Sequence, residues 1–288
     1  MQAVIFALIS YFTWGTGILV EAIVARRIQP YSLALWAFVL SSFTLSFYAP
    51  FVINELEGLT FGLLLLIIII GIIGLFIGTI VYYEALRISN RALVGTIASS
   101  FPAVAVVISV IFLHEKVSSQ QVIAIIIIFS GLILSSLNIR ELAKKKIFSD
   151  KGVLLAFITM LCWGTWIALL KIPVREIGWF WPNYITFLLF PILFLYIKIR
   201  KIPIQRPTIN HAIIPLIVST VLVRVAEFSY NLGISKGLVT VVAPIAGANP
   251  TLFVILAFLF LKDPITKQQI IGIAITLIGI ALLSFLSI

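Results

Sequence analysis

Long apolar runs separated by short polar connections organise the chain. A membrane-spanning helix needs about 20 consecutive, mainly apolar residues, and ten segments of the sequence meet that requirement. The predicted spans cover residues 3–25, 31–53, 61–86, 92–113, 119–137, 152–171, 181–199, 211–232, 239–261 and 267–287. The longest polar connection, NIRELAKKKIFSDK at residues 138–151, falls at the midpoint of the chain, with five predicted spans on each side.

The amino-acid composition indicates that most of the protein's surface faces lipid. The 288 residues are 62% hydrophobic and only 10% charged, with a mean hydropathy of +1.22. Soluble domains are nearer half apolar and a quarter charged. The pattern therefore predicts an all-α integral membrane protein. The first run lacks the basic start and small-residue cleavage site of a signal peptide, so we interpret residues 1–25 as the first span.

The net charge of +10 does not indicate nucleic-acid binding. The basic residues lie at the ends of the apolar runs, as in cytoplasmic loops and near lipid headgroups. Cys162 is the only cysteine, so an internal disulfide is excluded. We expect the lipid bilayer and a small-molecule substrate as partners, with protons as a candidate coupling ion. We expect no cofactor, no metal and no nucleic acid.

The two halves of the sequence resemble each other. Residues 101–134 align with residues 249–282 at a constant offset of 148. Matched positions are Pro102 with Pro250, Glu115 with Asp263, Tyr82 with Tyr230 and, at an offset of 149, Trp14 with Trp163. We therefore predict a first five-helix repeat at 1–137, a basic linker at 138–151 and a second repeat at 152–288.

An odd number of spans in each half has a topological consequence. Five spans bring the chain out on the opposite side of the membrane, so the second copy must run inverted. Inverted repeats are a recurrent plan of secondary transporters, which bind substrate at the repeat interface near the bilayer midplane. The alternative is a duplication that serves packing alone.

The distribution of basic residues predicts an orientation. The connections after odd-numbered spans hold 15 lysines and arginines, whereas the opposite face holds four. Positive residues concentrate in cytoplasmic loops. This count places both termini away from the cytoplasm.

Several short motifs occur once in each half. Each half has a Trp-Gly near its start, a Tyr-x-x-[Ala/Gly]-[Leu/Ile] in its third span, and a proline followed 13 residues later by an acid. Together these motifs resemble the EamA-type branch of the drug/metabolite transporter superfamily, over essentially the whole chain. The resemblance implies ten helices around a central cavity lined mainly by spans 1, 3, 4, 6, 8 and 9, and alternating access. It also implies small organic substrates.

One connection departs from that family pattern. Members commonly have basic residues between spans 2 and 3 and cytoplasmic termini, whereas this connection reads NELEG at residues 54–58. The membrane orientation therefore stays open between the charge count and the family habit.

Charged residues inside spans are the first candidates for function, because they are costly in lipid. Arg224 and Glu227 lie three residues apart and hence on one helix face. One interpretation is an anion-binding guanidinium held in place by its own carboxylate. The other is a self-neutralising pair that merely tolerates burial.

Three further charges lie near span ends. Glu21 and Glu84 could exchange protons or bind substrate, or could reach toward headgroups, with Arg87 as a partner for Glu84. Lys171 lies close to the position that the repeat assigns to Glu21. We therefore hypothesise an opposite-charge pair between Glu21 and Lys171 across the pseudo-twofold axis.

Prolines and aromatic residues complete the candidate cavity. Pro102 and Pro250 break their helices and free backbone carbonyls, either as cavity lining or as ordinary kinks. Trp14 and Trp163 lie too deep for an interfacial belt and would form flat cavity walls. The remaining candidates share a polar side chain within a span: Thr16, Tyr82, Tyr83, Ser99, Thr165, Tyr230, Asn231 and Asn249.

These observations predict a secondary transporter that moves a small organic solute by alternating access. An amino acid or related metabolite is the expected solute, with export as one direction. The alternatives are a sugar or nucleotide-conjugate carrier of the same fold, and a channel. An intramembrane enzyme is disfavoured because the only aspartates, Asp150 and Asp263, lie in connections. We expect a multi-pass protein of the plasma membrane, as a monomer or homodimer.

Overall fold

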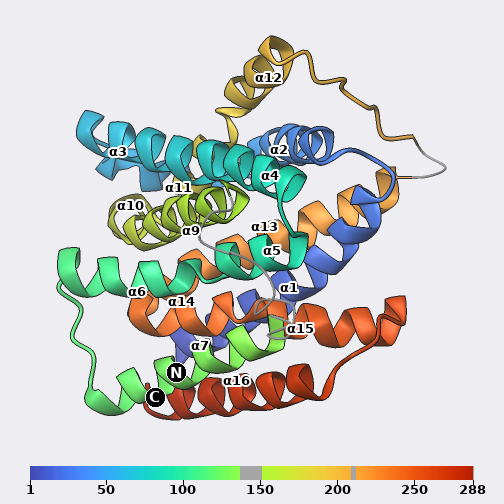
Figure 1. Ribbon diagram of the computed structural model, residues 1–288. Coiled ribbons are helices and arrows are strands. Elements are labelled where there is room, and N and C mark those ends of the chain that lie inside the picture. The colour runs from blue at the N-terminus through green and yellow to red at the C-terminus, as the bar shows by residue number, and fades with distance from the viewer. Residues whose placement is uncertain (137–150, 209–211, 288) are drawn as a thin grey trace.

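The computed structural model describes residues 1–136, 151–208 and 212–287, and these residues form helices and no strands. Nine helices of the described residues are long and apolar enough to cross a membrane, or ten if one bent pair counts as a span. The predicted all-α membrane fold with about ten spans is therefore confirmed (Figure 1). The predicted linker at 138–151 lies outside the described residues except for Lys151.

The spans of the first half are partly segmented. They are α1 (Gln2–Ala25); α2 (Pro30–Ser46) with η1 (Ala49–Gly58); α3 (Phe61–Gly71), η2 (Ile72–Gly78) and α4 (Thr79–Ile88); α5 (Arg91–Ser99) with α6 (Phe101–Phe112); and α7 (Ser119–Ser136).

The second half has a similar order of elements. It consists of α9 (Lys151–Leu169) with α10 (Lys171–Ile177); α11 (Trp181–Phe187) with α12 (Phe190–Ile199); α13 (Ile213–Lys236); α14 (Val239–Gly247), α15 (Asn249–Leu256) and η4 (Ala257–Leu261); and α16 (Lys267–Phe285).

One predicted boundary is wrong. The predicted span 31–53 ends as a helix at Ser46, and the chain then turns by 89° into η1. Pro50 gives the physical reason, because its ring would clash with the carbonyl of Ser46 and it has no N–H to continue the helix.

Two helix breaks meet inside the bundle. α5 ends before Ser100 and α14 ends before Ala248, and Pro102 and Pro250 each stand in the first turn of the next segment. A Cβ on Gly247 would collide with the ring of Pro102, so the two breaks lie directly against each other. Pro is tolerated in a first helical turn because the N–H that it lacks would be unpaired there.

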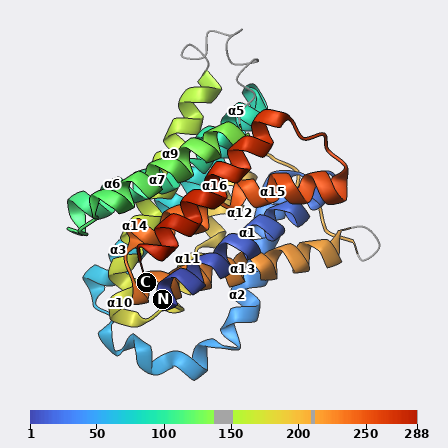
Figure 2. The ribbon, with the colours of Figure 1, turned by 90° about the horizontal axis from the view of Figure 1, so that it is seen from below.

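Small residues let the helices approach closely. α1 packs along α13, and α9 packs along η2 and α4. Cβ atoms on Gly17 and Gly78 would meet Val223 at 2.9 Å and Trp163 at 2.8 Å, respectively. α7 and α16 lie side by side in both views (Figures 1 and 2). In lipid, burying apolar surface between helices excludes no water. Helices therefore associate through close packing of this kind.

The same packing relates the two predicted repeats. The first helix of each half contacts the third span of the other half, as α1 with α13 and α9 with α4. Each first helix also contacts the fourth span of the other half, as α1 with α14 and α15, and α9 with α6. Equivalent helices therefore exchange partners between the halves.

Candidate functional site

Arg224 occupies an aromatic setting in the middle of α13. Its Nη1 donates to Glu227 Oε2 at 2.5 Å, and the two side chains are only 12% and 6% exposed. Its guanidinium carbon lies 4.3 Å from the ring centroid of Phe187 and 5.8 Å from that of Phe38. Guanidinium groups bind aromatic faces through the negative ring quadrupole. One carboxylate and two rings therefore orient the cation.

The guanidinium is not saturated by these contacts. Arg224 Nε is buried and has no hydrogen-bond partner. A buried donor without a partner is costly. The group thus retains capacity to bind an acceptor.

Glu21 belongs to the same cluster. Its carboxyl lies within electrostatic range of Arg224 and Glu227 on α13 and of Tyr82 and Tyr83 on α4, and no ion pair joins it to Arg224 in the described residues. α1, α4 and α13 thus bring together one cation, two acids and two phenols. These side chains were separate candidates in the sequence.

The predicted pair of Glu21 with Lys171 is wrong. Lys171 Nζ instead lies 2.6 Å from Glu115 Oε1, and both side chains are 3% exposed. The repeat identifies equivalent positions within the two halves, but equivalent positions need not touch. A buried ammonium pairs with the acid that packing places beside it.

Glu84 lies at the edge of the cluster. Its Oε2 accepts from Arg87 at 2.7 Å, and its Oε1 accepts from the Tyr31 hydroxyl at 3.1 Å. The Tyr31 and Tyr83 ring centroids are 5.1 Å apart. Because Arg87 is exposed, this ion pair contributes little stability.

The four matched aromatic residues form two pairs that cross between the halves. Trp14 contacts Tyr230 with ring centroids 6.0 Å apart, and Trp163 contacts Tyr82 at 5.1 Å. Tyr230 is fully buried and donates its hydroxyl to the Ile167 carbonyl at 3.2 Å. The Tyr82 pair is only half-buried. The two pairs are therefore equivalent in position but differ in access.

The remaining polar candidates differ in their contacts. Thr16 donates to the Phe12 carbonyl at 2.8 Å, and Asn249 donates to the Ala246 carbonyl at 3.0 Å beside the helix break. Asn231 is buried and donates to the Trp179 carbonyl at 2.8 Å. Ser99 and Thr165 are half-buried.

A second charged cluster ties the connection after α6 to the start of α14 and to Lys171, and we call it the Glu115 latch. Glu115 Oε1 accepts from Lys171 Nζ and from the backbone N–H of Val239 at 3.0 Å, and Oε2 accepts from Thr240 N at 2.9 Å. Lys171 Nζ also donates to the Gly237 carbonyl at 2.8 Å. The carboxylate thus satisfies the N–H groups at the start of α14, where a helix favours negative charge.

The equivalent connection in the second half lacks such an ion pair within the described residues. His114 and Lys262 both have left-handed backbones, with φ of 52° and 56°. Glu115 N donates to Ser109 O at 3.1 Å, and Asp263 N donates to Ala257 O at 3.3 Å. The two connections share this conformation, yet Asp263 is exposed and forms no ion pair within the described part of the chain.

The Glu115 latch predicts a pH dependence of stability. Burial alone would raise the pKa of Glu115, but the bonds from Lys171, Thr240 and Val239 outweigh it and hold the pKa below the ordinary value of 4.5. A depressed folded-state pKa adds stability above pH 4.5 that is lost as pH falls through the folded-state value. We expect the melting temperature to fall below pH 4.5, as measured by thermal unfolding in detergent.

A matched pair of variants assigns that loss. Glu115→Gln should flatten the decline below pH 4.5, whereas Asp263→Asn should retain it, because Asp263 is exposed. An equal decline in Glu115→Gln would show that other carboxylates dominate.

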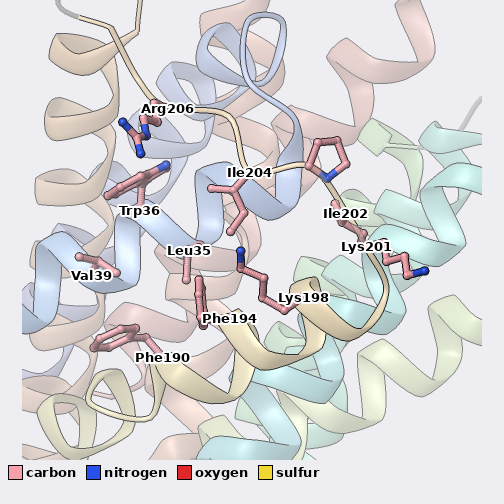
Figure 3. Close-up of a pocket in the computed structure, with 11 residues that line it drawn as sticks. Leu35, Trp36, Val39, Phe190, Phe194, Lys198, Lys201, Ile202, Ile204 and Arg206 are labelled. Atoms are coloured by element: carbon pink, nitrogen blue, oxygen red, sulfur yellow. The ribbon is translucent and has the colours of Figure 1, made fainter.

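A groove lies elsewhere, between α2 and α12 (Figure 3). It has a volume of about 720 Å³ and apolar walls that include Leu35, Val39, Phe190 and Phe194. These belong to the second and seventh spans and not to those that the resemblance implies as cavity lining. In residues 1–136, 151–208 and 212–287, no three metal-ligating side chains gather into a metal site.

Sequence reasoning missed the partners of the main candidates. Phe38 and Phe187, which flank Arg224, and Tyr31, which binds Glu84, come from the second and seventh spans. An aromatic residue in an apolar run has no distinguishing chemistry, so no sequence signal marked them. Glu115 was marked by the repeat, but its partners could not be read from spacing.

Comparison with known proteins gives three findings. The EamA-like transporter family matches residues 1–137 and 150–285. Uncharacterized protein MJ1333.1 of Methanocaldococcus jannaschii is 30% identical over 138 residues, which are 47% of this chain and 97% of that protein. A protein of known crystal structure superposes with a TM-score of 0.80 over 99% of this chain and 97% of its own, at 16% identity, which shows a shared fold. The chain belongs to the EamA-like transporter family, and it is a multi-pass membrane protein of a family that transports small solutes.

Proposed function

We propose that this protein is a secondary transporter of a small carboxylate-bearing solute, an amino acid or a related metabolite, in the plasma membrane. The observation that supports this solute class is Arg224, a cation inside a span with an unpartnered Nε. Arginine binds carboxylates through two parallel hydrogen bonds, and the energy is greater where water is scarce. The ion pair with Glu227 leaves part of the guanidinium free for a second carboxylate.

The surrounding charges favour a zwitterion over a simple anion. Glu21 and Glu227 give the cluster two acids against one arginine. An amino acid would place its carboxylate on Arg224 and its ammonium toward Glu21, so that every charge has a partner. A neutral sugar would bring no second carboxylate to Arg224, and a nucleotide phosphate would meet two carboxylates. Glu21 is also the candidate group for coupling to protons.

We propose alternating access between the two ends of the bundle. In this proposal the latch acts as the seal at the end where α13 and α14 meet, and the exposed Asp263 connection lies at the unsealed end. Exchange of these roles between two equivalent halves, 1–137 and 152–288, would move the opening across the membrane. The relative MJ1333.1 is about half as long as this chain, which supports a five-helix unit as the building block.

Binding of solutes to the purified protein tests the proposed substrate class. We expect amino acids to raise the melting temperature in detergent, whereas the corresponding amino acid amides, sugars and nucleotide sugars should not. The amides keep the ammonium and side chain but lack the carboxylate that Arg224 would bind. Stabilisation by sugars or nucleotide sugars alone would overturn the proposal.

Cysteine labelling tests the proposed seal. Thr240 is fully buried and its hydroxyl has no hydrogen-bond partner, so Thr240→Cys in a Cys162→Ala background removes no side-chain bond. Adding Glu115→Gln should speed maleimide labelling at least about 10-fold, since hydrogen bonds to a charged group contribute about 1.5–3 kcal/mol. Cysteine at the exposed position of Asp263 should label rapidly in both backgrounds. Equal rates at residue 240 would contradict the seal.

A further inference from the structure

The segment at residues 202–206 lines the groove between α2 and α12 and is held by hydrogen bonds to α2 and the residue before it. The chain that follows α12 returns along α2, and Trp36 Nε1 donates to the Gln205 carbonyl at 2.9 Å. Gln205 also accepts from Gln29 N at 2.7 Å through its side chain, and Gln205 N donates to Ser32 Oγ at 3.0 Å. These bonds tie residues 202–206 to the start of α2, so the groove is part of the folded structure.

The groove combines an apolar wall with a basic rim. Leu35 and Val39 from α2 face Phe190 and Phe194 from α12 across the hollow (Figure 3). Its charged lining residues are Lys198, Lys201 and Arg206, which are all basic. Figure 3 shows the Lys198 amine turned toward the hollow, and this amine lies 5.5 Å from the Phe194 ring centroid.

The basic residues of the rim have no acidic partner among the residues that the structure describes. Lys198 and Arg206 form no ion pair with any acid in residues 1–136, 151–208 and 212–287. Exposed apolar side chains continue from the groove along α12, at Leu195 and Ile199. Exposed apolar side chains of a spanning helix suit contact with lipid chains, and Lys198 and Arg206 lie at and after the end of α12, where polar headgroups are expected.

We propose that this groove binds an anionic phospholipid. One acyl chain would lie between α2 and α12 against Leu35, Val39 and Phe194, and the phosphate would bind Lys198 and Arg206. Basic pockets between helices at a membrane surface attract anionic headgroups, with about 1 kcal/mol for each lysine or arginine. Charge complementarity selects an anionic lipid over a zwitterionic one, because the rim supplies cations and no acid to bind a choline. This site is independent of the proposed solute at Arg224.

Lipid titration followed by native mass spectrometry tests the proposal. The intact protein in neutral detergent is titrated with phosphatidylglycerol or phosphatidylcholine of identical acyl chains. We expect phosphatidylglycerol to bind at least 10-fold more tightly. The double variant Lys198→Gln/Arg206→Gln should lose about 30-fold in affinity for phosphatidylglycerol, at about 5-fold for each basic residue, and should bind phosphatidylcholine unchanged.

Two controls keep the result interpretable. Lys267→Gln removes an exposed lysine at the start of α16 and should retain the preference for phosphatidylglycerol. Val39→Trp fills the wall of the groove and should weaken binding of both lipids, which separates an acyl-chain site from a bare phosphate site. Equal affinity of the wild-type protein for the two lipids would overturn the proposal. So would a double variant that keeps the preference, or inorganic phosphate that displaces the lipid at equal concentration.

Discussion

Replacing Arg224 by lysine is expected to reduce amino acid uptake into proteoliposomes about 10- to 150-fold, because charge-assisted hydrogen bonds contribute about 1.5–3 kcal/mol. Lysine keeps the positive charge beside Glu227 but has no planar fork for a second carboxylate. It also loses the stacking of a flat cation on Phe187, which lies 4.3 Å from the guanidinium carbon. We therefore expect weaker binding of the solute, whereas the ion pair with Glu227 should be retained.

Two comparisons distinguish binding from folding. Lys236→Gln removes an exposed cation from the last turn of the same helix and should transport at the wild-type rate. The melting temperature of Arg224→Lys should stay near the wild-type value, while amino acids should no longer raise it. Normal uptake by Arg224→Lys would exclude the guanidinium as the carboxylate site.

Replacing Glu115 by glutamine is expected to lower the free energy of unfolding by about 3–5 kcal/mol, the cost of removing one member of a buried ion pair. Lys171 would stay buried at 3% exposure without a counter-charge. An amide also places an NH₂ group where Glu115 now accepts from Lys171, Val239 and Thr240, so one of these donors would face another donor.

The double variant Glu115→Gln/Lys171→Met should recover much of that loss, because it removes both charges together. Asp263→Asn alters the equivalent acid of the other half and should change stability by less than about 0.5 kcal/mol, as expected for an exposed residue. Unfolding in a denaturing detergent measures all three variants. A loss in Asp263→Asn equal to that in Glu115→Gln would contradict the difference between the two ends.

The apolar pattern predicts the spans well because lipid imposes one strong requirement on every helix. The predicted span 239–261 coincides with the helical span Val239–Leu261. The predicted span 61–86 corresponds to Phe61–Ile88, which ends two residues later than predicted. The predicted end of the second span was wrong because hydropathy alone does not include the effect of Pro50 on the preceding turn.

The candidate site was predicted in part. Arg224 and Glu227 could be paired from a spacing of three residues, because such residues share a helix face. The partner of Lys171 could not, since Glu115 is 56 residues away and reaches it only through tertiary packing. The repeat matched Trp14 with Trp163 and Tyr82 with Tyr230, but which tryptophan meets which tyrosine depends on how the halves pack.

Counterflow in proteoliposomes tests the carrier mechanism and its Arg224 site together. Vesicles are loaded with the unlabelled amino acid that stabilises the protein most, and the same amino acid is added outside in labelled form. Alternating access predicts a transient accumulation of label above its equilibrium level in wild-type and Lys236→Gln vesicles, and none in Arg224→Lys vesicles. A flux that rises linearly with concentration without any overshoot, or an overshoot that Arg224→Lys leaves intact, would contradict the account.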